Sequence, residues 1–226
     1  MDVEVVGDVA GRAADVVAEV AVDAVAARGR CALAFSGGTT PAAMFAELAT
    51  RPVPWERLDV FQVDERVAPD GHPDRNLTAL RAALLDLDMV RAAHAYPMPV
   101  TAPDLAAAAA GYDARLRDAC GGVLDLVHLG LGDDGHTASW PPGDPVVDAP
   151  QNVAIVGPYR GRPRMTLTPA AVNRARRVLW LVSGEAKAEM LRRLVEGSSR
   201  IPAARVRDEN SLVIADQAAA RLLRRA

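Results

Sequence analysis

One histidine stands among glycines and carboxylates in the stretch VHLGLGDDGHTASWPPG, which runs from residue 127 to residue 143. An apolar run leads into three glycines that let the chain fold sharply, and His136 follows Asp133 and Asp134. An imidazole titrates near neutrality and can take a proton from water, while a neighbouring carboxylate can fix its tautomer. We therefore predict that His136 moves a proton. An ordinary surface or core histidine is the alternative.

The stretch FSGGTTP, residues 35–41, is typical of a loop that holds an anion. Gly37 and Gly38 let the backbone approach a ligand closely, and the amides of the helix that follows attract negative charge. Together with Thr39 they suit a phosphate group. The ending of a Walker loop is absent, and so is a dinucleotide fingerprint. A tight turn with a threonine cap is the alternative.

The stretch VDERVAP, residues 63–69, places three charges in a predicted loop after an apolar run. Arg66 carries a planar guanidinium that can clamp an oxyanion, and Asp64 can orient a sugar hydroxyl or a catalytic group. A solvated cluster of charges is the alternative.

Further cations follow in the stretch PYRGRPRMTLT, which supplies Arg160, Arg162 and Arg164. We expect one of these arginines to face the anion and the others to face solvent. Lys187 is the only lysine in the chain, and we place it in the first turn of a predicted helix. A cation there opposes the helix dipole, so its presence indicates a specific task such as a contact to phosphate. Chance is the alternative.

Other hydrolytic chemistries fit the sequence less well. The surroundings of Ser36 and Ser183 lack the first glycine of a nucleophile elbow. Two groups of possible metal ligands have no recognisable spacing. These groups are Asp133, Asp134 and His136, and His72 with Asp74. We predict neither a metal nor an organic cofactor.

The composition also excludes several classes of partner. The 226 residues carry a formal net charge of −3, so we expect no nucleic acid and no anionic membrane. No segment has the pattern of a signal peptide or a bilayer span. Cys31 and Cys120 form neither a disulfide framework nor a zinc motif. We predict reduced thiols and a cytoplasmic protein.

Short apolar runs alternate with helical stretches along the chain. The predicted strands are Val3–Val6, Cys31–Phe35, Leu58–Val63, Leu124–Leu129, Val153–Val156, Met165–Thr168 and Arg177–Val182. The predicted helices are Ala13–Ala27, one with Pro41 in its first turn, Asn76–Leu85, Asp104–Cys120, Glu185–Val195 and Gln217–Arg225. This order predicts one α/β domain over residues 1–226, with a mainly parallel, Rossmann-like sheet covered by helices on both faces. Four polar loops then meet at the carboxyl edge of the sheet, where such folds bind ligands, and these loops are SGGTTP, DERVAP, GLGDDGHTAS and SGEAK.

Five motifs in order give the chain a resemblance to the 6-phosphogluconolactonases. They are LAFSGGTTP, VDERVAP followed by RN, LGLGDDGHTAS, RMTLT and VSGEAKAEML, and the similarity continues to IPAARV. The resemblance implies a fold shared with glucosamine-6-phosphate deaminase and ribose-5-phosphate isomerase. It also implies hydrolysis of 6-phosphoglucono-δ-lactone in the oxidative pentose phosphate pathway, without a cofactor. The runs SWPPG and YRGRPR depart from the family pattern. These departures concern the shape of the lid and the choice of the arginine that contacts the phosphate, and not the reaction.

By this resemblance His136 is the general base, and Asp134 orients it. The residues implied in substrate binding are Gly37, Gly38, Thr39, Asp64, Arg66, Asn76, Arg164 and Lys187. The only partner implied is a small phosphorylated sugar lactone, and we expect a monomer or a weak homo-oligomer. A sugar-phosphate isomerase or deaminase of the same fold, or a sugar-phosphate sensor without activity, are the alternative functions.

Overall fold

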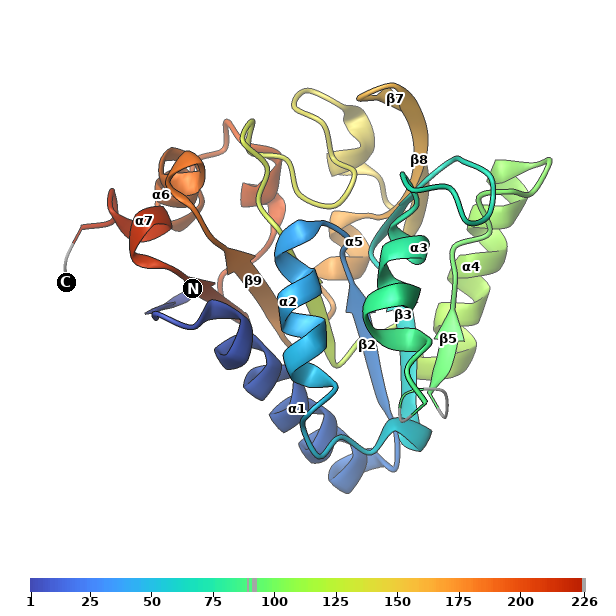
Figure 1. The fold of residues 1–226 in the computed structure, drawn as a ribbon. Helices are drawn as coiled ribbons and strands as arrows, with labels where there is room; N and C mark the ends of the chain where they lie inside the picture. The colour runs from blue at the N-terminus through green and yellow to red at the C-terminus, as the bar shows by residue number, and fades with distance from the viewer. Residues whose placement is uncertain (89, 91–92, 225–226) are drawn as a thin grey trace.

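A seven-stranded parallel sheet forms the centre of the structure (Figure 1), in the strand order β1-β10-β9-β6-β2-β3-β5. The structure is a computed structural model that describes residues 1–88, 90 and 93–224, except for the side chain of Thr39. The strands are β1 (Asp2–Val5), β2 (Cys31–Phe35), β3 (Leu58–Gln62), β5 (His94–Tyr96), β6 (Leu126–Leu129), β9 (Val178–Val182) and β10 (Ser211–Ala215).

The inner strands are apolar along their whole length because both faces of the sheet are covered. Every residue of β2, β3, β6, β9 and β10 is buried. Successive side chains point to opposite faces, so Leu33 and Phe35 enter one core while Ala32 and Ala34 enter the other. The predicted α/β class and its mainly parallel sheet are confirmed.

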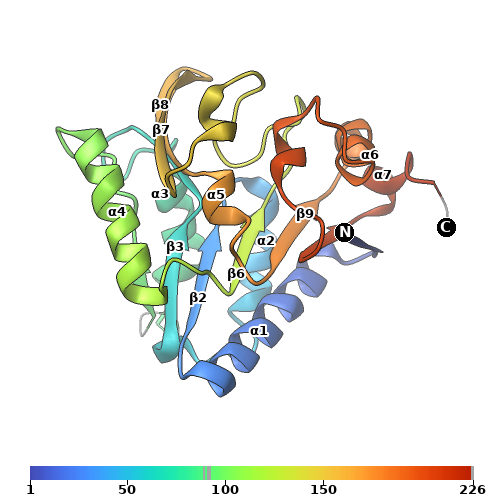
Figure 2. The same cartoon turned by 180° about the vertical axis from the view of Figure 1, so that it is seen from behind.

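Helices cover both faces, as predicted. The helices are α1 (Val9–Arg28), α2 (Thr39–Leu48), α3 (Asn76–Leu80), α4 (Leu105–Cys120), α5 (Pro169–Val172), α6 (Ala188–Val195) and α7 (Gln217–Ala220). The first three pack on the face seen in Figure 1, and the other four pack on the face seen in Figure 2. Asp8 caps the first turn of α1, and Gly29 ends that helix with a φ of 78°.

A second, three-stranded sheet stands above the carboxyl ends of β2 and β3 (Figure 1). Its strands are β4 (Asp64–Arg66), β8 (Arg162–Leu167) and β7 (Val153–Tyr159), all antiparallel. The prediction of a loop at residues 64–66 is therefore wrong, because Glu65 is buried and pairs with Arg75 at 3.0 Å. The strands predicted near 153 and 165 exist, but they form a hairpin outside the parallel sheet.

Several boundaries also differ from the sequence prediction. Strands β5 and β10 were not predicted, because their apolar runs are short. The helix predicted from residue 76 divides into α3 and a π-helical turn, Arg81–Leu85. The helix predicted from residue 217 ends at Ala220, and its predicted end at Arg225 lies outside the described residues. In the described part of the chain, no helix is both long and apolar enough to cross a bilayer.

Candidate active site

The loops after β2, β6 and β9 and the strand β4, which follows β3, enclose one pocket of about 340 Å³ at the carboxyl edge of the parallel sheet. The loops after β2 and β6 lie at its centre, between neighbouring strands whose chains continue in opposite directions across the sheet. Such a switch point is where open α/β sheets bind ligands. A larger groove of about 1070 Å³ lies beside β1, α6 and α7, but valines and arginines dominate its lining, and it shares no lining residue with this pocket.

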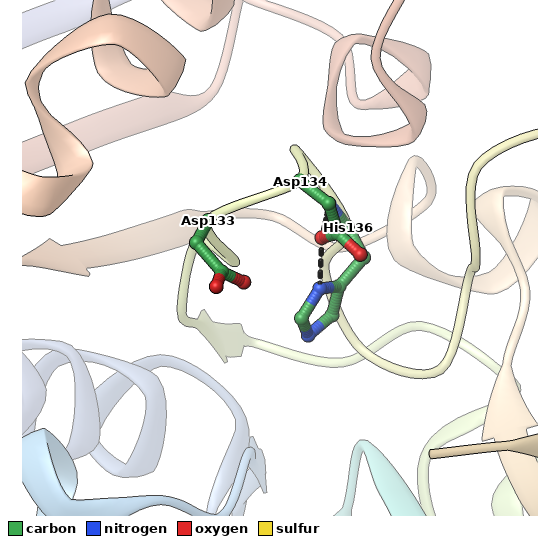
Figure 3. A group of neighbouring side chains, drawn as sticks. All are labelled: Asp133, Asp134 and His136. Carbon is green, nitrogen blue, oxygen red and sulfur yellow. Dashed lines mark hydrogen bonds and ion pairs between the residues drawn. The ribbon is translucent and has the colours of Figure 1, made fainter.

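His136 and Asp134 form the pair with the clearest catalytic geometry (Figure 3). Nδ1 of His136 lies 2.5 Å from Oδ1 of Asp134, which also accepts the backbone N–H of His136 at 3.1 Å. Burial opposes the ionised form of Asp134, but hydrogen bonds from Tyr159 and His136 hold the pKa of its carboxyl well below the usual range. The carboxylate therefore fixes a proton on Nδ1 and leaves Nε2 as an acceptor.

Two glycines of this loop are required by its geometry. A Cβ atom on Gly132 would lie 2.0 Å from Nδ1 of His136. Gly135 has a φ of 82°, and a Cβ atom there would lie 2.5 Å from the side chain of Ile201. The glycines therefore allow the imidazole to fold back over the loop that carries it.

The loop after β2 forms the opposite wall of the pocket. Ser36, Gly37 and Gly38 line it, and the N-terminus of α2 follows. A Cβ atom on Gly37 would overlap the Asn76 side chain, at 2.0 Å from Oδ1. Gly38 has a φ of 128°, which favours glycine. The side chain of Thr39, a predicted phosphate contact, lies outside the described residues.

Asp64 and Asn76 also line the pocket, where they are bonded to each other. The Asn76 amide donates to the Asp64 carboxylate at 3.0 Å, and the Ser139 hydroxyl donates to it at 2.6 Å. Burial raises the pKa of Asp64. Arg164 lies 3.9 Å from the same carboxylate, and burial lowers the pKa of its guanidinium. This network fixes the polar wall beside the glycine loop.

Four cationic side chains face the pocket: Arg66, Arg160, Arg164 and Lys187. The expectation that only one arginine of the stretch 160–164 faces it is therefore wrong, because Arg160 and Arg164 both do. Only Arg162 turns away, to pair with a carboxylate at 2.6 Å outside the pocket.

Lys187 differs from the arginines because the structure gives it no hydrogen bond or ion pair among the described residues. It ends a 3₁₀ turn, Glu185–Lys187, and directly precedes α6. The α-helix therefore begins at Ala188, one turn later than predicted, and Lys187 lies just before its first turn. Arg160, by contrast, pairs with Asp133 at 2.7 Å.

Asp133, Asp134 and His136 also bring three possible metal ligands within 4.8 Å of one another. In the structure Asp133 pairs with Arg160, while Asp134 bonds to His136 and Tyr159. The prediction that the site works without a metal stays a prediction.

Sequence reasoning missed Tyr159 and Ser139, which hold two carboxylates of the site. The Tyr159 hydroxyl donates to Oδ2 of Asp134 at 2.5 Å, and Ser139 donates to Asp64. The sequence points to these two residues only through the motifs in which they lie. Tyr159 comes directly before the arginine and glycine of PYRGRPRMTLT, and Ser139 is the last residue of DGHTAS.

The comparisons with known proteins agree with this fold and show the family. Residues 6–214 match the family model described as glucosamine-6-phosphate isomerases/6-phosphogluconolactonase, and the chain belongs to this family. Among its curated relatives, a 6-phosphogluconolactonase of Synechocystis sp. is 40% identical over 174 residues, which cover 74% of this chain and 72% of the relative. A 6-phosphogluconolactonase of Streptomyces coelicolor is 34% identical over 225 residues, with coverage of 90% and 86%.

Solved structures support the same fold. The crystal structure of 6-phosphogluconolactonase from Thermotoga maritima aligns with a TM-score of 0.87 and 23% identity, and covers 95% of this chain and 98% of that one. A monomeric glucosamine-6-phosphate deaminase aligns with a TM-score of 0.82 and 21% identity, with coverage of 98% and 100%. At these identities the likeness concerns the fold alone.

Proposed function

We propose that this protein hydrolyses 6-phosphoglucono-δ-lactone to 6-phosphogluconate. The observation that carries the proposal is that His136, held by Asp134, faces the same pocket as the glycine loop and four cations. One six-carbon phosphorylated ligand can therefore reach the base and the anion-binding groups together. The names of the curated relatives support the choice of a lactone as substrate.

The reaction needs only a water molecule and a base. Nε2 of His136 accepts a proton from water while the water oxygen attacks the lactone carbonyl carbon. The tetrahedral intermediate then expels the ring oxygen, which takes the proton back from the imidazolium as the ester bond breaks. General-base help of this kind is typically worth about 10²–10⁴-fold. A δ-lactone is an activated ester, so no covalent nucleophile is required.

The cations have two tasks in this proposal. Lys187 and the amides of Gly37 and Gly38 hold the phosphate, because the lysine forms no hydrogen bond or ion pair with the described residues and the glycine loop precedes a helix N-terminus. Arg66 and Arg164 balance the charge that develops on the carbonyl oxygen and orient the sugar. Anchoring the phosphate at a distance from the ester supplies the orientation that water attack requires.

Asp64 and Asn76 have a positioning task. Both line the pocket, and their mutual bonds fix the edge against which the sugar hydroxyls pack. In the cell we place the activity in the oxidative pentose phosphate pathway, in the cytoplasm.

The test is acid release from freshly generated lactone by the purified protein, followed at constant pH against the spontaneous rate. We expect an acceleration that is retained after treatment with a metal chelator. Ammonia release from glucosamine 6-phosphate, with no effect on the lactone, would replace this proposal by a deaminase. Saturable binding of 6-phosphogluconate without turnover of either compound would indicate a sugar-phosphate sensor.

A further inference from the structure

A tyrosine from another element reaches the Asp134–His136 pair. Tyr159 stands at the end of β7, and its hydroxyl donates to Oδ2 of Asp134 at 2.5 Å. The same hydroxyl oxygen lies 3.1 Å from Nδ1 of His136, and the two rings meet edge to face with centroids 5.4 Å apart. Asp134 is thus held through both oxygens, one by the histidine and one by the tyrosine.

The second contact matters because a cation competes for the same carboxylate. Arg160 lies 3.7 Å from Oδ2 of Asp134 while it pairs with Asp133 at 2.7 Å. The Asp134 side chain is 35% exposed, so packing alone does not hold its orientation. Without the Tyr159 hydroxyl, Oδ2 is free to turn to the guanidinium, and the imidazole loses its fixed acceptor.

The hairpin holds the tyrosine in place. The guanidinium carbons of Arg160 and Arg164 lie 5.4 Å and 5.2 Å from the Tyr159 ring centroid, and Arg164 donates to its backbone carbonyl at 3.2 Å. The turn that follows has left-handed backbone at Arg160, with a φ of 50°, and at Gly161, with a φ of 86°. Such a turn joins β7 to β8 tightly and directs Tyr159 toward the loop that carries His136.

We infer that Tyr159 is a positioning residue of the reaction, which keeps Asp134 on His136 and away from Arg160. Its hydroxyl completes a Tyr-Asp-His chain in which the proton on Nδ1 is fixed and Nε2 stays available. The inference rests on the proposed function for its kinetic consequence. Its structural consequence, a single imidazole tautomer, does not depend on which substrate is used.

The experiment compares Tyr159→Phe with Tyr96→Phe as a matched control. Tyr96 also donates its hydroxyl to an aspartate, Asp59, at 3.2 Å, but it lies on β5, and Asp59 does not line the pocket and is not part of the Asp134–His136 pair. In Tyr159→Phe we expect kcat for the lactone to fall about 10-fold while KM changes less than about 2-fold. The fall is smaller than the full effect of a general base, about 10²–10⁴-fold, because His136 itself is retained. Tyr96→Phe keeps both constants.

The ¹⁵N shifts of the His136 ring provide the second readout. We expect the wild type and Tyr96→Phe to show one tautomer protonated at Nδ1, and Tyr159→Phe to show averaged shifts from two tautomers. Unchanged kcat and unchanged ring shifts in Tyr159→Phe would overturn the inference. A variant whose KM rises as much as its kcat falls, and whose His136 ring keeps one tautomer, would also overturn it. A wild type inactive on the lactone would refute the proposed function, while the ring shifts would still decide the role of Tyr159.

Discussion

His128 gives the structure a defined sensitivity to acid. It lies on β6 with no exposed surface, and its ring centroid is 6.3 Å from that of Phe35 and 6.5 Å from that of Phe45. Neither ring nitrogen has a hydrogen-bond partner among the described residues. Burial lowers the pKa of His128 from 6.5 to about 4. The folded protein therefore keeps this imidazole neutral at a pH where the unfolded chain protonates it.

The sign and size of the effect follow from proton linkage. Below pH 6.5 the unfolded state binds a proton that the folded state refuses until about pH 4, so stability falls as the pH falls through this interval. The slope is about 1.4 kcal/mol per pH unit, and between pH 7.5 and pH 4.5 the loss amounts to about 2 to 3 kcal/mol. This is a large part of the ~5–15 kcal/mol that typically stabilises a domain.

The assay is urea unfolding of the wild type and of His128→Leu at pH 7.5 and pH 4.5. All other groups titrate equally in the wild type and in His128→Leu. The difference between the two proteins in the free energy of unfolding lost from pH 7.5 to pH 4.5 therefore isolates the contribution of His128. We expect the wild type to lose about 2 to 3 kcal/mol more than the variant. Losses that agree within about 0.5 kcal/mol, the usual scatter for independent effects, would refute the assignment of a buried, unpartnered neutral imidazole.

Two further predictions concern the pocket. Gly132→Ala places a methyl group 2.0 Å from Nδ1 of His136 and must displace the ring, so we expect kcat for the lactone to fall at least about 10²-fold. Gly157→Ala, where nothing lies within 4 Å of the new atom, is the control, and equal rates in the two variants would contradict the placement of the imidazole. Lys187→Ala should raise KM about 10-fold or more and weaken inhibition by inorganic phosphate, since one charge-assisted contact is worth about 1.5–3 kcal/mol. An unchanged inhibition constant for phosphate would remove Lys187 from the phosphate site.

The sequence predicts those parts of the site that are local in the chain. Asp134 and His136 are two residues apart, and the glycines that shape their loop lie between and beside them. The meeting of the segments that follow four parallel strands at one edge also follows from the strand order, because parallel strands all end on the same side. These inferences need only short-range geometry and the connection rules of α/β folds.

The parts that were missed depend on contacts between distant segments. Tyr159 is 25 residues from Asp134 and meets it only because β7 and β8 form a hairpin outside the main sheet. Ser139 is 75 residues from Asp64. The three charged residues of β4 are typical of a loop, but β4 pairs with β8, and the buried Glu65 carboxylate is satisfied by Arg75 and by the backbone of Asn76 and Leu77.

Strand β10 shows a different limit of prediction from sequence. Its sequence SLVIA is a short apolar run that periodicity cannot distinguish from part of a buried helix. Its assignment follows from its neighbours, because it pairs with β9 along five residues and leaves β1 as the edge strand. The fold class was thus predicted correctly without this strand, while the width of the sheet was not.

The most direct test of the central claim separates turnover from binding in His136→Asn, with His94→Asn as the control. His94 is a largely exposed histidine on β5, outside the pocket. We expect kcat for the lactone to fall about 10²–10⁴-fold in His136→Asn, while calorimetry gives a dissociation constant for 6-phosphogluconate within about 3-fold of the wild type. A His136→Asn variant that hydrolyses the lactone as fast as the control would contradict the account.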